Sequence, residues 1–324
     1  MKRNNTDTVQ LSSGFRRMRM AGFFLHAAAY MPFPLLVVGW GHEAAYFYVA
    51  MLIGMFLSGP FNAYLGDACY RKSVFVWPLV ILLAVLLGYA YADEFIEWMA
   101  LAFLEGACLG LASAAGVTIS IDVTVSGNRS RANVLYARWS RIGMAVGLLL
   151  GFWIYGIYSL NGLLYTAIAF GLLGVLEAWR VHVPFRAPIG VKLCNWDRFI
   201  LPRAWLPAFN VWLLAFACGI FVSLLAYKGG ELWLYALLLV VASLLLSAVP
   251  LVRMFVRLSH HCQRGTSNTT LNLSIDAGMI SGFAVASYLM VSDVLLYVGV
   301  VAAVVSVLIF LIATSPYYKK KRVR

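Results

Sequence analysis

About ten long apolar runs restrict the fold of this chain more than any other feature of its sequence. Each is close to the ~20 residues that a helix needs to cross the ~30 Å hydrocarbon core of a bilayer. Hydrophobic residues make up 62% of the chain and charged residues only 12%, which is too little charge to cover a soluble globule. Lipid offers no partners to the open edge of a sheet, so each run must be a helix. The sequence predicts an all-α polytopic membrane protein with about ten transmembrane helices, near residues 20–40, 44–66, 73–92, 95–121, 133–158, 162–182, 204–226, 231–252, 270–291 and 294–314.

Lys and Arg residues concentrate at one set of span ends. When the chain is threaded ten times with its amino terminus in the cytoplasm, nearly all of the 25 Lys and Arg residues fall on the inner side, and Lys228 is the exception. Cytoplasmic loops of membrane proteins carry such an excess. The sequence therefore predicts two cytoplasmic termini. It assigns the net charge of +12 to the membrane surface and its lipids, and predicts no nucleic acid as partner.

The longest interruption between apolar runs follows the sixth span. It is richer in Pro and charge than its surroundings. This break predicts an N-terminal six-helix bundle over residues 1–183, a cytoplasmic linker over 184–203, and a C-terminal four-helix bundle with a basic tail over 204–324.

The loop after the second span carries a charged motif in the stretch GPFNAYLGDACYRKSVF. This stretch resembles the loop 2–3 signature of the major facilitator superfamily, Gly-x-x-x-Asp-(Arg/Lys)-x-Gly-(Arg/Lys)-(Arg/Lys). Asp67, Arg71 and Lys72 match the acidic and basic positions of the signature. Other positions depart from it, namely Ala63, Ala68 and Tyr70.

The resemblance implies a latch at the inner gate. Asp67 would interact with the amino-terminal end of a helix in the second half. Arg71 would pair with an acid at the inner end of the fourth helix, where Asp122 is suitably placed. The alternative is an ordinary basic inner loop that carries one solvated acid.

Two further stretches resemble the same family. Residues 119–151 are similar to its helix 4, loop and helix 5, and here Gly143, Gly147 and Gly151 share a helix face that permits close packing. Residues 260–282 are similar to the loop and start of the penultimate helix. Family members usually have twelve helices, so the resemblance implies that counterparts of helices 8 and 9 are absent. It implies a two-bundle arrangement of six plus four helices.

Ionisable residues inside the apolar runs are candidates for transport or coupling, because a charge at mid-depth costs about 3 kcal/mol. Glu105 lies near the midplane of the fourth span, and Arg141 lies somewhat inward on the fifth. Consecutive helices are usually neighbours, so we expect a Glu105–Arg141 pair. Glu105 is either a proton or cation site or part of a structural ion pair. His26, which shares a helix face with Tyr30, is a weaker candidate.

Neither an enzyme nor a metal site is indicated by the sequence. No GxSxG, phosphate-loop, HExxH or GxGxxG motif occurs in a suitable context. His260, His261 and Cys262 are adjacent and do not supply a convincing closed coordination shell. We therefore expect no enzymatic activity, no cofactor and no metal.

The favoured interpretation is a secondary active transporter in a bacterial inner membrane. It would move a small solute by alternating access, with proton coupling as one option. The alternative is a non-transporting, shortened relative that acts as a scaffold or is a degenerate remnant. A homo-oligomer could complete the shortened second bundle.

Overall fold

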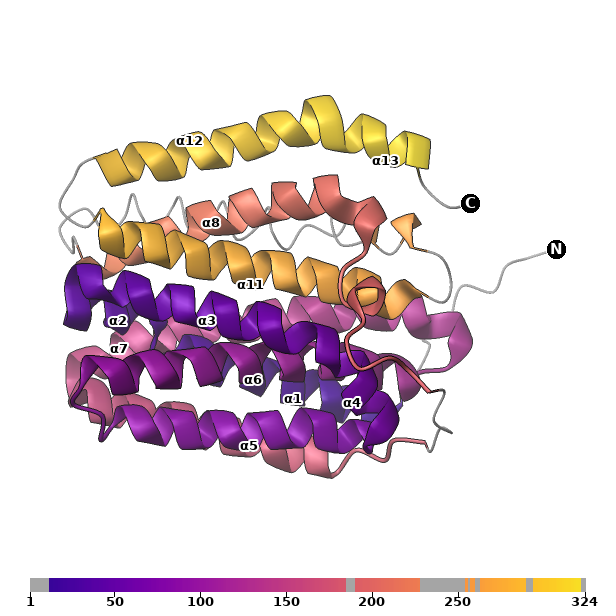
Figure 1. The fold of residues 1–324 in the computed structure, drawn as a ribbon, viewed down its shortest axis with the longest axis horizontal. Coiled ribbons are helices and arrows are strands. Elements are labelled where there is room, and N and C mark those ends of the chain that lie inside the picture. The colour runs from indigo at the N-terminus through magenta and orange to yellow at the C-terminus, as the bar shows by residue number, and fades with distance from the viewer. Residues whose placement is uncertain are drawn as a thin grey trace, which may run out of the picture.

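The computed structural model describes residues 12–184, 190–227, 254–255, 257–259, 263–289 and 294–321. These residues form helices and connecting turns, with no strand among them. The helices run roughly parallel or antiparallel to one another in a single bundle (Figure 1). The α-helices are α1 (Ser13–Tyr30), α2 (Phe33–Trp40), α3 (Ala44–Ser58), α4 (Asn62–Ala68), α5 (Arg71–Tyr89), α6 (Phe95–Asp122), α7 (Arg129–Trp179), α8 (Trp205–Tyr227), α11 (Arg264–Tyr288), α12 (Val294–Ile309) and α13 (Ser315–Lys321).

Short 3-10 helices and one π-helix connect or extend these elements. Pro32 and Pro60 lie at the breaks that follow α1 and α3, where a residue without an N–H interrupts the helical ladder. The 3-10 helices are Gly41–Glu43, Gly59–Phe61, Ser126–Asn128, Trp196–Arg198 and Pro202–Ala204, and the π-helix Phe310–Thr314 joins α12 to α13.

Every predicted apolar run within the described residues is largely helical, and the predicted and observed ends differ by up to seven residues. The predicted span 231–252 lies outside the described residues, so the number of about ten crossings stays a prediction. In the described part, six helical segments are long and apolar enough to cross a membrane: Ser13–Ala68, Arg71–Tyr89, Phe95–Asp122, Arg129–Trp179, Pro202–Ala226 and Val294–Lys321.

The segment Arg129–Trp179 contains 51 residues, and at about 1.5 Å per residue it is too long for one crossing of a ~30 Å core. The helix is interrupted at Ser159, which has φ 64° and ψ −174°. Gly143 before this point and Gly174 after it approach neighbouring residues of α1, Phe23 and Phe24. The segments of α7 before and after Ser159 thus both pack beside the same part of α1. This agrees with the two separate predicted spans 133–158 and 162–182.

Two groups of helices pack side by side. Helix α1 packs mainly on α7, and α6 packs on α3 and α5; we call α1–α7 the first half. Helix α8 packs on α11 and α12, which with α13 we call the second half. The second half lies along one side of the first half. Helix α11 is next to the first half, and α12 lies farthest from it (Figure 1). Contacts of α11 with α3 join the two halves.

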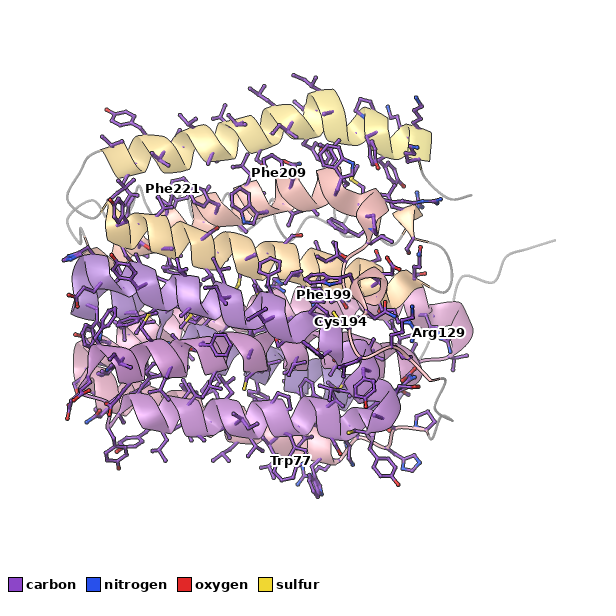
Figure 2. The ribbon with its side chains drawn as sticks, in the orientation of Figure 1. Trp77, Arg129, Cys194, Phe199, Phe209 and Phe221 are labelled. Carbon is purple, nitrogen blue, oxygen red and sulfur yellow. The ribbon has the colours of Figure 1, made fainter. Side chains whose placement is uncertain are left out.

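The start of α1 and the end of α13 lie at the same end of the bundle, on the right in Figure 1. We call it the inner end, after the predicted orientation, and the opposite end the outer end. Apolar side chains are exposed along the sides of the bundle, with Trp77 63% and Trp153 65% exposed. Figure 2 shows Trp77 projecting away from the helices. Exposed apolar side chains of this kind are expected where the sides of a helix bundle face lipid.

Candidate inner gate and central polar cluster

Arg71 and Asp122 form an ion pair at the inner end of the first half. Helix α5 begins at Arg71 and α6 ends at Asp122, so these antiparallel helices bring the two side chains together. The Asp122 side chain is 3% exposed and the Arg71 side chain 21% exposed. The contact that the resemblance implied is present, whereas its role as a latch stays a prediction.

Asp67 and Lys72 bind backbone groups at the same end. Asp67 Oδ2 accepts hydrogen bonds from the backbone N–H groups of Gly190 at 2.8 Å and Val191 at 3.0 Å, both in the predicted linker. Lys72 Nζ donates to the carbonyl oxygens of Trp179 at 2.8 Å and Val181 at 3.2 Å. Its positive charge thereby meets the carbonyls that a helix leaves unpaired at its carboxyl end. Lys72 thus covers the end of α7.

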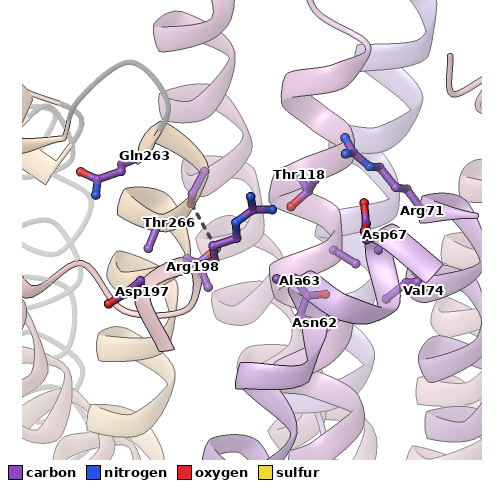
Figure 3. Close-up of a pocket in the computed structure, with 14 residues that line it drawn as sticks. Asn62, Ala63, Asp67, Arg71, Val74, Thr118, Asp197, Arg198, Gln263 and Thr266 are labelled. Carbon is purple, nitrogen blue, oxygen red and sulfur yellow. Dashed lines mark hydrogen bonds between the residues drawn. The ribbon is translucent and has the colours of Figure 1, made fainter. Parts of the chain in front are cut away.

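A cavity of about 450 Å³ lies between the two halves at the inner end. Its first-half wall comes from α4, α5 and α6, and its other wall from the linker and the start of α11. In Figure 3 the side chain of Arg198 extends from the linker toward Thr118 of α6, and Asp67 lies across from Gln263 and Thr266. The lining residues are Asn62, Ala63, Gly66, Asp67, Arg71, Val74, Ala115, Thr118, Asp197, Arg198, Gln263, Gly265, Thr266 and Thr269.

A buried ion pair joins the halves farther from the inner end. Arg141 Nη1 of α7 donates to Asp276 Oδ1 of α11 at 2.6 Å. The hydroxyl of Tyr30 on α1 donates to the same oxygen at 2.6 Å. The side chains of Arg141 and Asp276 are 7% and 2% exposed. An ion pair in such surroundings needs additional hydrogen bonds to offset its desolvation, and Tyr30 supplies one.

His26 lies next to this pair but binds other groups. Its Nδ1–H donates to the Gly22 carbonyl oxygen at 2.8 Å, because a carbonyl can only accept. The Nε2 atom then accepts from the Ser113 hydroxyl of α6 at 3.1 Å. The His26 and Tyr30 rings are nearly parallel, with centroids 6.4 Å apart, as their shared helix face predicted.

The predicted Glu105–Arg141 pair is wrong. Glu105 Oε2 accepts a hydrogen bond from the Tyr89 hydroxyl of α5 at 2.8 Å, and Oε1 has no partner in the described part of the chain. Arg141 pairs with Asp276 instead. The reason is helix packing: α6 presents Glu105 to α5, whereas the Arg141 side chain reaches across to the second half. Consecutive helices need not turn their polar groups toward each other.

The predicted glycine face packs against the backbone of α1. A Cβ added at Gly143, Gly147 or Gly151 would clash with the carbonyl oxygens of Phe23, Ala27 and Met31 respectively. Contact between the two helices at this distance therefore requires residues without a side chain at these positions.

Aromatic rings from both halves pack on the outer side of the Arg141–Asp276 pair. Tyr30 lies 4.6 Å from Phe33, ring centroid to ring centroid. Phe283 of α11 lies 5.8 Å from Phe33 and stacks on Tyr48 of α3 at 5.4 Å. All four side chains are fully buried. The halves are therefore closed at this level, whereas a cavity separates them at the inner end.

A sequence model described as the Major Facilitator Superfamily matches residues 18–192, more than half of the chain. The chain belongs to the major facilitator superfamily. The resemblance found in the loop after the second span is thereby confirmed. Membership identifies a multi-pass membrane protein of a family whose members transport small solutes, and thus a transporter rather than an enzyme.

Solved structures of major facilitator proteins share the fold at low identity. The human organic anion transporter MFSD10 is 14% identical, with a TM-score of 0.62 over 92% of this chain and 99% of that one. A point mutant of the nucleoside transporter NupG is 12% identical, with a TM-score of 0.61 over 93% and 98%. FucP in its outward conformation is 12% identical, with a TM-score of 0.59 over 96% and 99%. No curated protein sequence matches the chain.

We call Arg141, Asp276 and Tyr30 the central cluster. Two of these residues, Asp276 and Tyr30, were not among the predicted site residues. Asp276 is an ionisable residue inside the predicted span 270–291, and this was the signal that could have found it. Tyr30 was noted only as a neighbour of His26. The described residues contain no group of three or more His, Cys, Asp or Glu side chains that could hold a metal. His260, His261 and Cys262 lie outside the described ranges.

Proposed function

We propose that this chain is a secondary active transporter that moves a small solute across a bacterial inner membrane, with both termini cytoplasmic. The solute would pass between an N-terminal bundle, residues 1–183, and a C-terminal bundle, residues 204–324, joined by a cytoplasmic linker over 184–203. One observation carries the proposal: the charged side chains of Arg141 and Asp276 meet between the two halves, are buried inside the bundle, and are joined there by Tyr30. Charged groups at such positions are costly and typically mark solute or ion pathways.

Alternating access requires that one side of this cluster be closed while the other is reachable. The packed rings of Tyr30, Phe33, Tyr48 and Phe283 supply a closed outer side, and the 450 Å³ cavity supplies space at the inner side. This combination corresponds to a state that faces inward. The opposite state would separate the ring cluster and close the cavity.

The predicted latch fits this cycle. Asp67 on α4 and Gly265 near the start of α11 line the same cavity from opposite halves. Closing the cavity would bring the Asp67 carboxylate toward the amino-terminal end of α11, where the helix dipole favours a negative charge. The Arg71–Asp122 pair lies wholly within the first half and would keep α5 fixed to α6 during this movement.

Glu105 is the candidate for proton coupling. It is fully buried, and in the described residues its only hydrogen-bond partner is the neutral Tyr89 hydroxyl. An ionised carboxylate is costly in such surroundings, so a change of its protonation state would strongly alter the free energy of the conformation that buries it. His26 and the Arg141–Asp276 pair are further candidates for contact with the solute or proton.

The test is solute-driven proton movement in proteoliposomes. A screen of small solutes for thermal stabilisation of the purified protein first supplies the solute, because a ligand that binds only the folded state raises apparent stability. Glu105→Gln retains the acceptor for Tyr89 but cannot ionise, so we expect it to abolish proton-coupled flux while the protein still inserts. Glu177→Gln is the matched control, since Glu177 lies near the end of α7 beside Arg180 at 4.0 Å. Unchanged coupling in Glu105→Gln would remove Glu105 from the mechanism.

A further inference from the structure

Helices α7 and α11 face each other along a polar seam between the two halves. Asn268 Nδ2 donates to the Asn133 carbonyl oxygen at 3.5 Å, and Arg141 binds Asp276 at 2.6 Å. Both contacts join residues 135 positions apart. The two helices therefore run in the same direction and in register, and Asn272 lies between these contacts, facing α7.

The seam contains buried hydrogen-bonding groups that no described residue satisfies. Arg141 binds Asp276 through Nη1, whereas its Nε and Nη2 atoms are buried and have no partner in the described part of the chain. The same is true of both amide atoms of Asn272, which is 1% exposed. A buried polar group without a partner costs about 1–3 kcal/mol. Native proteins satisfy nearly all such groups, so this cluster indicates a binding site.

The geometry of Arg141 indicates the kind of ligand. Nε–H and one N–H of Nη2 point from the same edge of the planar guanidinium group, and such a paired edge matches the two oxygens of a carboxylate. Asp276 already balances the positive charge of Arg141. A monoanion would leave one net negative charge at this depth and a dianion two, and charge inside a membrane is costly. The site therefore fits a monocarboxylate better than a phosphate monoester, which is largely dianionic at neutral pH.

One face of α11 connects the inner cavity to this cluster. Gly265 and Thr269 line the cavity, and Asn272 and Asp276 follow at intervals of three and four residues on the same helix face. At about 1.5 Å per residue, Asp276 lies about 10 Å beyond Thr269. Arg141, Asn272 and Asp276 do not line the cavity itself, so a ligand would move past Thr269 to reach them.

We propose that the free edge of Arg141 and the side-chain amide of Asn272 bind the carboxylate of a small organic monoanion that arrives from the inner cavity. Arg141 holds one carboxylate through Nε and Nη2 while Nη1 remains on Asp276. The Asn272 amide donates to the ligand or accepts from its hydroxyl group. This inference rests on the proposed transport function, for which it names the class of solute.

Thermal unfolding of the purified full chain tests the site with matched pairs of probes. L-lactate, benzoate and nicotinate are each compared with lactamide, benzamide and nicotinamide, which have similar shapes without the charge. At least one carboxylate should raise the melting temperature in a saturable way, and its amide should not. Equal stabilisation by both members of a pair would overturn the proposal. The proposal would also be overturned if no carboxylate in the panel stabilised the protein. Water alone would then be the hydrogen-bond partner of the free Arg141 and Asn272 groups.

Variants on the two helices assign the site. Arg141→Lys keeps a positive charge near Asp276 but loses the paired edge, so the Kd of the stabilising carboxylate should rise at least tenfold. Arg138→Lys makes the same change at an exposed position on the same helix and should leave the Kd within about twofold. Asn272→Ala leaves the ion pair intact and should weaken binding severalfold, which tests the site even if Arg141→Lys does not fold. Wild-type affinity in Arg141→Lys or Asn272→Ala would contradict the assignment.

Uptake of the same probes into proteoliposomes separates this inference from the proposed function. A carboxylate that binds through Arg141 but is not taken up would leave the site in place and refute transport of that solute. Uptake of neutral solutes only, without carboxylate binding, would support the transporter and overturn the site.

Discussion

The Asp122 side chain is 3% exposed at the end of α6, where its carboxylate meets the Arg71 guanidinium. The Arg71 side chain is 21% exposed and lines the inner cavity, so the pair is partly buried. Removing the Asp122 charge would leave the partly buried Arg71 guanidinium without its charged partner. This ion pair is therefore expected to contribute to stability as well as to the proposed gate.

Asp122→Asn should lower the free energy of unfolding by about 1–3 kcal/mol, because Arg71 loses its charged partner. The apparent melting temperature in detergent measures the effect. Glu177→Gln is the control, because the 4.0 Å Glu177–Arg180 pair is more exposed and such pairs contribute at most about 1 kcal/mol. Equal melting temperatures for the two variants would show that burial does not distinguish these pairs.

At the scale of the helix, glycine determines how closely two elements approach in both halves. In the second half, a Cβ at Gly278 or Gly282 of α11 would clash with the carbonyl oxygens of Trp212 and Phe216 on α8. The first half uses the same device where α7 meets α1. Lipid provides little hydrophobic drive for helix association, so close van der Waals packing has to hold each half together. Two tightly packed halves suit a mechanism in which each moves as a unit.

Gly147→Ala should destabilise the α1–α7 contact by about 1–3 kcal/mol, since the added methyl group meets the Ala27 carbonyl and the helices must separate. Gly156→Ala is the control on the same helix, because a Cβ there meets nothing within 4 Å. Alanine is the better helix former, so this control should be neutral or stabilising by up to about 1 kcal/mol. Thermal unfolding in detergent measures both variants. A loss in Gly156→Ala as large as that in Gly147→Ala would contradict the packing argument.

Helix α11 tolerates its polar composition because many of its hydroxyl groups bind its own backbone. Thr269, Thr270 and Ser274 each donate to the carbonyl oxygen four residues earlier, at 3.1, 2.8 and 2.7 Å. Such bonds satisfy a buried hydroxyl without any partner from another helix. Asn272 has no such bond, which is why it stands out as a group available to a ligand.

In the part of the molecule that the structure describes, large apolar side chains are exposed along the sides of the bundle. Cys69 and Cys194 are both exposed near the inner end, close to α4 and in the linker. Cys108 and Cys218 are buried. The exposed thiols therefore report which side of the membrane the inner end faces.

A membrane-impermeant maleimide should label Cys69 and Cys194 in inside-out vesicles and not in intact cells. The labelling uses a Cys262→Ser background, since Cys262 lies outside the described residues. Tyr91→Cys, at an exposed position between α5 and α6 at the outer end, should show the opposite pattern. Labelling of Cys69 from one side and Cys194 from the other would overturn the threading on which the orientation depends.

The sequence alone determined the helices and their approximate ends, because a span must be about 20 residues long and apolar. It also identified Arg71 and Asp122 as partners, through the family signature, and the face of α7 that carries Gly143, Gly147 and Gly151. These features are local, or belong to a pattern shared across the family. The number of crossings, the gating roles and the coupling roles stay predictions.

Only the tertiary structure decided which buried charges meet. In a soluble helix the polar face marks the side that faces water, but in a bilayer the lipid-facing and core-facing sides are both apolar, so the sequence does not show how each helix is rotated. Glu105 and Arg141 therefore looked like partners because their helices are consecutive. Arg141 instead meets Asp276, 135 residues away, because the two halves pack with α7 beside α11.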